Sequence, residues 1–258
     1  MSEAPLLAAE GLSIRFGRIA AVEDASFALW PGEVLAIVGE SGSGKTTLLR
    51  ALHGDIALDS GRVHYTTRSG ETVEIHRLPE PIRRALARTE WGFVHQNPRD
   101  GLRMAVSAGG NVGERLMAAG ARHWGRIREE ARAWLARVEI DGARIDDPPR
   151  TFSGGMQQRL QIARVLVTHP RLVLMDEPTG GLDVSVQARL LDLIRTLVAE
   201  FGIAAVIVTH DLAVARLLAD RMLVMQRGRI VEAGLTDQVL DDPQHAYAQL
   251  LVSSVLQA

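Results

Sequence analysis

The 258-residue sequence contains no cysteine. Disulfide bonds, thiolate zinc sites, cysteine-ligated iron–sulfur clusters and cysteine nucleophiles are therefore excluded. An excess of either charge is also missing, because 29 basic and 31 acidic side chains give a formal net charge of -2 at pH 7. A chain with this balance has no overall basic field that would attract nucleic acid. We therefore expect no nucleic-acid partner.

Long apolar runs are missing too. No uncharged stretch approaches the roughly 20 residues that a membrane-spanning helix needs. The first residues, MSEAPLLAAEG, carry acidic side chains and lack the basic start and long apolar run of a secretory signal. The sequence therefore predicts a soluble, cytoplasmic protein that could reach a membrane only through a partner. Hydrophobic residues still make up 47% of the chain, which is enough for a large core.

One stretch, Gly39–Thr47, organises the rest of the chain; it reads GESGSGKTT. It fits the phosphate-binding P-loop pattern of a glycine, four free positions, then glycine, lysine and serine or threonine. The apolar run Val34–Val38 before it predicts a buried strand, and Thr47–His53 after it predicts a helix. The glycines let backbone N–H groups approach a phosphate, and the helix dipole points its positive end at the same place. Lys45 would bind the β- and γ-phosphates, and Thr46 would offer its hydroxyl to Mg²⁺.

Polar side chains stand directly after three apolar stretches of the sequence. Asp176 and Glu177 end the stretch Arg171–Met175, and two carboxylates there are costly unless a cation or a reaction needs them. The first suits Mg²⁺, and the second suits a general base for an attacking water. Gln96 and His210 follow two other apolar stretches, at the edge where open α/β sheets bind ligands. Taken alone, each of these two could equally be an ordinary surface residue.

A second glycine motif, TFSGGMQQ, covers Thr151–Gln158. Ser153 stands where a helix N-cap belongs, and a helix over Gln157–Val167 is predicted to follow. A helix N-terminus preceded by two glycines and a hydroxyl is a potential anion site, because its N–H groups are free and its dipole is positive. Taken alone, the motif could equally be a simply capped helix.

Residues 98–152 differ from the rest of the chain in composition. Alanine, arginine and glutamate become frequent, β-branched residues become scarce, and Trp134 lies on an apolar stripe at helical spacing. We interpret Trp134 as a core residue. We expect a helical subdomain over residues 98–160, inserted into an α/β core made of residues 1–97 and 161–258.

Residues 6–30 alternate in polarity and predict short strands joined by turns at Gly11 and Gly17, forming an antiparallel β edge. Phe16 is the one aromatic residue of the first predicted strand pair. It could stack on an adenine ring, or it could be a plain core phenylalanine. The local pattern does not decide between these two interpretations.

These pieces, in this order, resemble ATP-binding cassette (ABC) ATPases over essentially the whole chain. The serine-glycine-glycine motif placed shortly before an Asp-Glu strand end is the most specific feature, because other P-loop proteins lack it. The resemblance implies an α/β P-loop NTPase fold with a mixed sheet core, an antiparallel β edge and an inserted helical subdomain. It also implies a single ABC ATPase domain over residues 1–258 that converts ATP and water to ADP and phosphate with Mg²⁺ as cofactor.

The same resemblance implies roles within one chain. Phe16 stacks on adenine. Glu177 polarises the attacking water, and His210 contacts the γ-phosphate. Thr46 and Gln96 contact Mg²⁺, and Asp176 helps to place it. Gln96 is also expected to be a catalytic residue. The phosphates are held by the P-loop residues Gly39, Ser41, Gly42, Ser43, Gly44, Lys45, Thr46 and Thr47.

Further implied roles need a second copy of the chain. The motif residues Ser153, Gly154, Gly155 and Gln157 bind the nucleotide of the other subunit, and Asp183 lies at the seam between the subunits. One helix N-terminus from each subunit then faces the same ATP, so ATP joins two chains head to tail as a homodimer. Hydrolysis of ATP removes the γ-phosphate that links the two subunits. The dimer is then a two-state switch, joined when the γ-phosphate is present and open when it is absent.

The finer resemblance is to the branch that includes oligopeptide and nickel importer ATPases, carried by EPTGGLDVSVQARLLDLI and DDPQHAYAQLL. Within this branch the chain is similar to the ATP-binding proteins of carbon–phosphorus lyase systems, which serve phosphonate breakdown. Four stretches carry that similarity: Arg88–Gly125, Glu139–Asp147, Thr151–Pro170 and Gly234–Gln257.

Three functions follow from these resemblances. The leading one is an ATPase that acts on soluble carbon–phosphorus lyase subunits. The alternative is an importer subunit that drives a membrane permease for peptides, nickel or phosphonate. The third is a nucleotide-regulated assembly factor with slow hydrolysis. The segment Asn97–Leu116 is expected to meet the partner, and Arg99–Arg103 replaces the serine-leucine-asparagine-proline stretch common in importers, which suggests a different docking surface.

Overall fold

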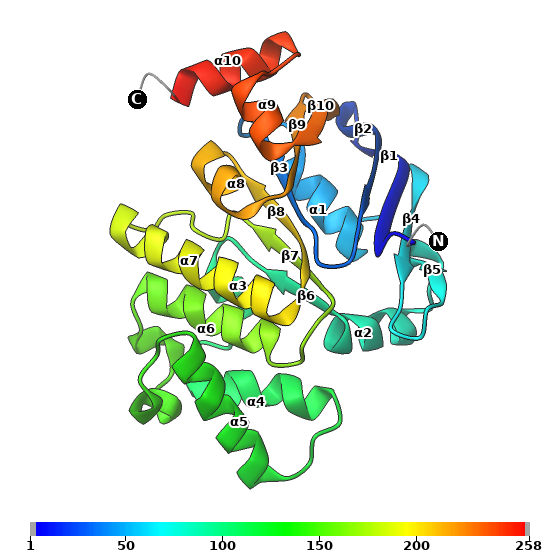
Figure 1. Ribbon diagram of the computed structural model, residues 1–258. Coiled ribbons are helices and arrows are strands. Elements are labelled where there is room, and N and C mark those ends of the chain that lie inside the picture. The colour runs from blue at the N-terminus through cyan, green and yellow to red at the C-terminus, as the bar shows by residue number, and fades with distance from the viewer. Residues whose placement is uncertain (1–3, 256–258) are drawn as a thin grey trace.

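The computed structural model describes residues 4–255, and its strands form two sheets (Figure 1). The larger sheet is formed by β3 (Val34–Val38), β6 (Trp91–Val94), β7 (Leu172–Asp176), β8 (Ala204–Thr209), β9 (Arg221–Gln226) and β10 (Arg229–Leu235). Its order is β10-β9-β3-β8-β7-β6, and all neighbours are parallel except the pair β9 and β10. Every residue of β3, β7 and β8 is buried, which confirms the buried strand predicted at Val34–Val38.

The smaller sheet is antiparallel and is formed by β1 (Leu7–Phe16), β2 (Ile19–Leu29), β4 (Ser60–Thr66) and β5 (Thr72–Glu74), in the order β2-β1-β4-β5. The predicted antiparallel edge and its turn at Gly17 are confirmed. The turn predicted at Gly11 is wrong. Gly11 lies inside β1, where its φ of +58° accompanies a register shift between Ala9 and Leu12. A glycine in a strand often marks such a bulge, because it adopts positive φ without strain.

Helices pack on both faces of the six-stranded sheet. They are α1 (Lys45–His53), α2 (Glu80–Thr89), α6 (Gly154–Leu166), α7 (Val184–Phe201), α8 (Leu212–Leu218), α9 (Thr236–Asp241) and α10 (Ala246–Val255). Alternate residues of β7 show the two faces: Leu172 and Leu174 join the core around α1, while Val173 and Met175 join the core around α6 and α7. The core around α1 also includes side chains of β1, so α1 lies between the two sheets (Figure 1).

A helical lobe lies at the bottom of the view in Figure 1. It contains α4 (Ala108–Ala118), α5 (Trp124–Arg137) and short 3-10 turns at 142–146 and 149–151, while α3 (Pro98–Gly101) packs against α6 and β6. Trp134 is 1% exposed and stacks on Phe201 of α7 with ring centroids 5.4 Å apart, which confirms it as a core residue. The predicted lobe boundary at residue 160 falls inside α6, a helix that packs against both α4 and β6.

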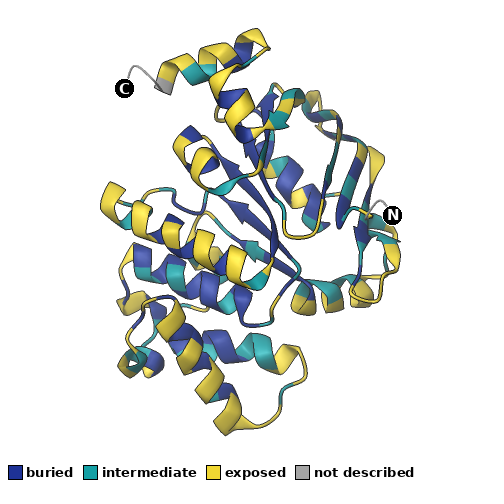
Figure 2. Cartoon of the chain, viewed as in Figure 1, coloured by how far each residue is buried: buried dark blue, intermediate teal, exposed yellow. Residues whose placement is uncertain are grey.

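Buried positions gather in the strands and on the inward faces of the helices, while the outer face of the lobe is exposed (Figure 2). The last helix of the described chain, α10, ends at Val255. Among residues 4–255, no helix combines the length and apolar character that crossing a membrane requires.

Candidate nucleotide site

The P-loop, Gly39–Thr47, connects β3 to α1 in the predicted strand–loop–helix order. Gly39 and Gly44 have φ values of +151° and +105°. A Cβ atom at Gly39 would overlap the carbonyl oxygen of Met225, and one at Gly44 would overlap that of Ala21. Glycine is therefore required at both positions. Gly44 is also the N-cap of α1 and supplies no side-chain acceptor, so the first N–H groups of the helix remain available to an anion.

Lys45 is held at the centre of the loop. Its side chain is buried, and its Nζ atom donates to the carbonyl oxygens of Gly39 at 2.7 Å and Glu40 at 2.8 Å. Burial lowers the pKa of Lys45, because the charged form loses solvation, and the carboxylates of Glu177 and Asp176 oppose this shift. The ammonium is thus placed where a phosphate would compete with two backbone carbonyls for it.

Thr46 and Asp176 face each other across the junction of α1 and β7. The Thr46 hydroxyl donates to Asp176 Oδ1 at 3.0 Å. Burial raises the pKa of Asp176, the hydrogen bond from Thr46 opposes this, and the charge of Glu177 adds to it. Among residues 4–255, no cluster of three or more histidine, cysteine or acidic side chains could hold a metal by itself. A hydroxyl, a carboxylate and the nearby Gln96 amide instead fit Mg²⁺, which takes few protein oxygens beside phosphate and water.

Glu177 and His210 form a pair at the ends of β7 and β8. Glu177 Oε1 lies 2.8 Å from His210 Nδ1, and the backbone N–H of Glu177 donates to Val208 at 2.9 Å. Glu177 has a φ of +44°, a left-handed conformation that is strained for a residue with a side chain. The chain accepts this strain at the one residue where the sequence predicts a general base.

One cavity of about 840 Å³ brings most of the predicted residues together. Its lining includes the P-loop residues Gly39, Ser41, Gly42, Gly44, Lys45, Thr46 and Thr47, and the side chains of Gln96, Glu177 and His210. Ser43 is buried behind the loop, 3.5 Å from Lys45 Nζ. Asp176 does not line the cavity itself, but it accepts a hydrogen bond from Thr46, which does. A phosphate in the cavity would therefore meet the lysine, the helix N-terminus and the Glu177–His210 pair at once.

Glu40, within the predicted P-loop stretch, also lines the cavity, whereas five other lining residues were not predicted from the sequence: Ile19, Ala20, Ala21, Arg227 and Leu251. Only Arg227 had a local signal, the Arg-Gly turn between two apolar strands. Phe16 is 54% exposed and does not line the cavity, although it pairs with Ile19, which does. Its stacking on adenine therefore stays a prediction.

The second glycine motif lies outside this cavity. Ser153 is the N-cap of α6 and accepts a hydrogen bond from the backbone of Met156 at 3.3 Å, as predicted. Gly154 and Gly155 form the first turn. Gly154 lines a separate cavity of about 400 Å³, which Gln96 also lines. Within one chain the two glycine motifs do not meet.

Two further predicted residues have these positions. Gln157 is buried, and its amide donates to the carbonyl oxygens of Pro149 and Phe152, so its side chain holds the turn before α6. Asp183 is exposed at the start of α7, next to Val184, which is 84% exposed. Nucleotide contacts from these two residues stay predictions.

The fold and the site define a class of protein. Residues 22–180 match the family described as ABC transporter. The chain belongs to this family and is an ABC-type ATPase that binds ATP. It is 65% identical over 253 residues to a protein of Escherichia coli (strain K12) described as "Putative phosphonates utilization ATP-binding protein PhnK", with 98% of each chain covered.

Two further matches have lower identity. A Brucella ovis protein described as a putative peptide import ATP-binding protein is 37% identical over 270 residues, which cover 99% of this chain and 79% of the relative. Among solved structures, a dimeric ATP-binding cassette in a post-hydrolysis state with ADP and Pi superposes with a TM-score of 0.79 at 28% identity. That match covers 89% of this chain and 98% of the other.

Proposed function

We propose that this chain is the Mg²⁺-dependent ATPase subunit of a carbon–phosphorus lyase system that breaks down organic phosphonates. The observation that carries the proposal is the 65% identity, over 98% of both chains, to a protein described as serving phosphonate utilization. The predicted docking segment, Asn97–Leu116, supports a partner other than a permease, because Arg99–Arg103 replaces the stretch common in importers. Arg99, Asp100 and Arg103 are exposed and so free to meet a partner.

The geometry of the cavity supports a hydrolytic mechanism. Lys45 and the N–H groups at the start of α1 bind the β- and γ-phosphates. Mg²⁺, when bound by Thr46 and Gln96 beside Asp176, supplies positive charge for the same phosphates. The Glu177 carboxylate accepts a hydrogen bond from the water that attacks the γ-phosphorus, and His210, 2.8 Å away, orients that carboxylate. Water gives its oxygen to phosphate, ADP leaves, and the water proton passes to Glu177.

A second copy of the chain would complete the site. The start of α6, with Ser153–Gly155, lies outside the P-loop cavity of its own chain. Its first two N–H groups, those of Gly154 and Gly155, have no partner within the helix and would meet a γ-phosphate held by the other subunit. Val184, beside Asp183, is 84% exposed, so the start of α7 is accessible to a second chain. We infer a dimer that ATP closes and hydrolysis opens, and this arrangement supports it.

Glu177→Gln tests both the chemistry and the partner. The variant should bind ATP and hydrolyse it about 100- to 1,000-fold more slowly, because it keeps the side-chain shape and loses the base. It should therefore stay closed on ATP and retain its partner. Tagged protein is recovered with ATP and Mg²⁺ from cells grown on a phosphonate. We expect soluble lyase subunits, without a permease, among the recovered proteins.

Glu129→Gln, at an exposed position of α5, is the matched control and should turn over ATP at the normal rate. Normal turnover by Glu177→Gln would refute the catalytic assignment. Recovery of a membrane permease would favour the second candidate, an importer subunit, which the peptide-import relative at 37% identity supports. The two results address different parts of the proposal, because turnover reports the site and recovery reports the partner.

A further inference from the structure

The C-terminal helix reaches the P-loop. The hydroxyl of Tyr247, in the first turn of α10, accepts a hydrogen bond from the backbone N–H of Glu40 at 3.0 Å. The Tyr247 ring is buried in the core cluster that contains Val38, the last residue of β3 before the loop. Leu251, one turn further along α10, lines the nucleotide cavity. The hydroxyl is thus presented to the loop by a fixed ring.

The peptide group that Tyr247 contacts is bonded at both ends. Its N–H, from Glu40, is donated to Tyr247, and its carbonyl oxygen, from Gly39, accepts from Lys45 Nζ at 2.7 Å. Gly39 also packs so closely on the backbone of Met225 in β9 that no Cβ would fit. A rotation of this peptide would turn its carbonyl away from the ammonium and its N–H away from the hydroxyl. The orientation that Tyr247 fixes is therefore the one that holds Lys45.

The start of α10 is itself attached to the sheet. Glu232 of β10 accepts hydrogen bonds from the backbone nitrogens of Gln244 at 2.8 Å and His245 at 2.9 Å. His245 Nδ1 in turn accepts from the backbone nitrogen of Tyr247 at 3.1 Å. These bonds run from β10 to the helix start and on to the P-loop. The tyrosine is therefore placed by hydrogen bonds between β10 and the start of α10.

We propose that Tyr247 is a positioning residue of the nucleotide site: its hydroxyl fixes the Gly39–Glu40 peptide and, through it, the ammonium of Lys45 that receives the phosphates. The inference rests on the proposed nucleotide site and deepens it. Without the hydroxyl, the N–H of Glu40 is left to water and the peptide gains rotational freedom that ATP binding must remove. One hydrogen bond of this kind corresponds to about a three- to tenfold change in affinity.

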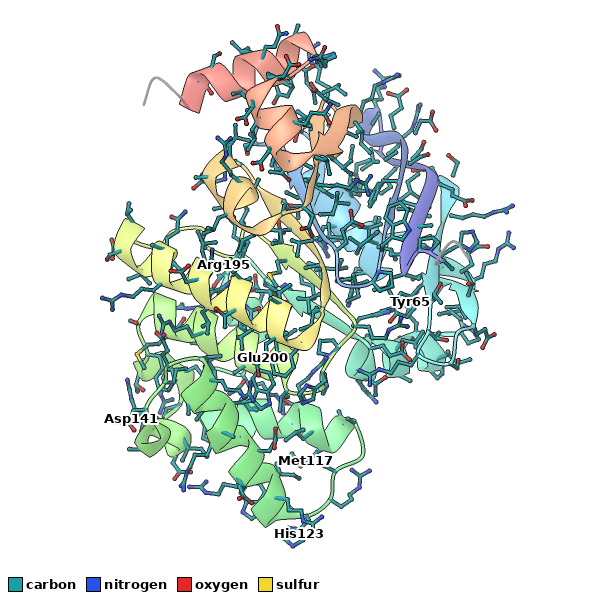
Figure 3. All side chains as sticks on the ribbon, in the orientation of Figure 1. Tyr65, Met117, His123, Asp141, Arg195 and Glu200 are labelled. Atoms are coloured by element: carbon teal, nitrogen blue, oxygen red, sulfur yellow. The ribbon has the colours of Figure 1, made fainter. Side chains whose placement is uncertain are left out.

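Tyr247→Phe tests the inference, because it keeps the buried ring and removes only the hydroxyl. The matched control is Tyr65→Phe, since the chain has two tyrosines, both side chains are buried and each hydroxyl makes a hydrogen bond. Tyr65 donates to Glu90 at 2.9 Å and lies on β4, away from α10 (Figure 3). The measurements are the equilibrium Kd for ATP and the KM and kcat of hydrolysis by purified protein.

We expect Tyr247→Phe to raise Kd and KM for ATP about three- to tenfold and to leave kcat at saturating ATP within about twofold, because the Glu177–His210 pair is untouched. Tyr65→Phe should leave Kd and KM at the wild-type values. Unchanged Kd and KM in Tyr247→Phe would overturn the inference, as would a fall in kcat with constant KM in both variants, which marks a lost folded fraction. These constants are independent of the partner, so their failure is distinct from failure of the lyase assignment.

Discussion

Asn111→Ala should destabilise the segment that we expect to meet the partner. Asn111 lies in the first turn of α4 and is fully buried, at 0% exposure. Its Oδ1 atom accepts a hydrogen bond from the backbone of Arg103 at 2.8 Å. Its Nδ2 atom lies 3.0–3.1 Å from the carbonyl oxygens of Arg103, Val106 and Ser107. One side chain thus holds the loop between α3 and α4 at several points.

The magnitude follows from these contacts. The amide accepts one hydrogen and donates two, which the three carbonyls share, so alanine removes three hydrogen bonds. Each contributes about 1 kcal/mol net to the free energy of unfolding, and buried backbone groups left without partners cost more. We expect a loss of about 3 kcal/mol. For a chain of this length, 1 kcal/mol corresponds to about 2–4 °C in melting temperature, so Asn111→Ala should melt about 6–12 °C lower.

The assay is thermal unfolding of the nucleotide-free protein by calorimetry. Asn97→Ala is the control, because Asn97 is exposed and its side chain makes a single hydrogen bond, to the backbone of Arg99. If Asn111→Ala melts no lower than Asn97→Ala, the reasoning is refuted.

Asn111→Asp tests the same site through pH. Burial raises the pKa of the new carboxyl, so the folded variant holds its proton more tightly than the unfolded chain. The loss of melting temperature relative to the wild type should therefore grow as pH rises.

The remaining predictions concern the site. Burial raises the pKa of Asp176, so this group binds its proton more tightly in the folded state and lowers stability as pH rises. Asp176→Asn should abolish Mg²⁺-dependent turnover yet melt higher than wild type, by a margin that grows from about pH 4 to about pH 7; a constant margin would contradict this. A Cβ at Gly155 would overlap Val186 of α7. Gly155→Ala should thus weaken ATP-driven dimerisation in size-exclusion chromatography without changing ATP binding by one chain; normal dimerisation would contradict it.

Much of the fold was predictable because its signals are local. The P-loop stands between an apolar run and a helix start, and both elements appear within two residues of the predicted bounds. The carboxylates Asp176 and Glu177 were recognised because charge at the end of a buried strand is costly. His210 joins them because β7 and β8 are parallel neighbours, so their ends meet at one edge of the sheet.

Other features depend on packing that no local pattern encodes. Tyr247 and Glu40 are 207 residues apart in sequence, and only the docking of α10 on the sheet brings them together. Gln157 belongs to the glycine motif, yet its amide turns inward because the 3-10 turn before α6 leaves carbonyls to be satisfied there. Gly11 is of a residue type common in turns, but it lies within β1 because β1 pairs with β2 on one side and β4 on the other.

Buried contacts of α6 connect the second glycine motif to the predicted docking segment. Gln161 of α6 is fully buried, and its amide bonds both the N–H and the carbonyl of His95, the residue before Gln96. It also packs against Gly101 of α3 so closely that no Cβ fits there. The helix that begins after Ser153 therefore cannot shift without carrying Gln96 and α3 with it. A force applied to α6 by ATP in a second subunit would reach the docking segment through buried hydrogen bonds, because packed interiors transmit displacement instead of absorbing it.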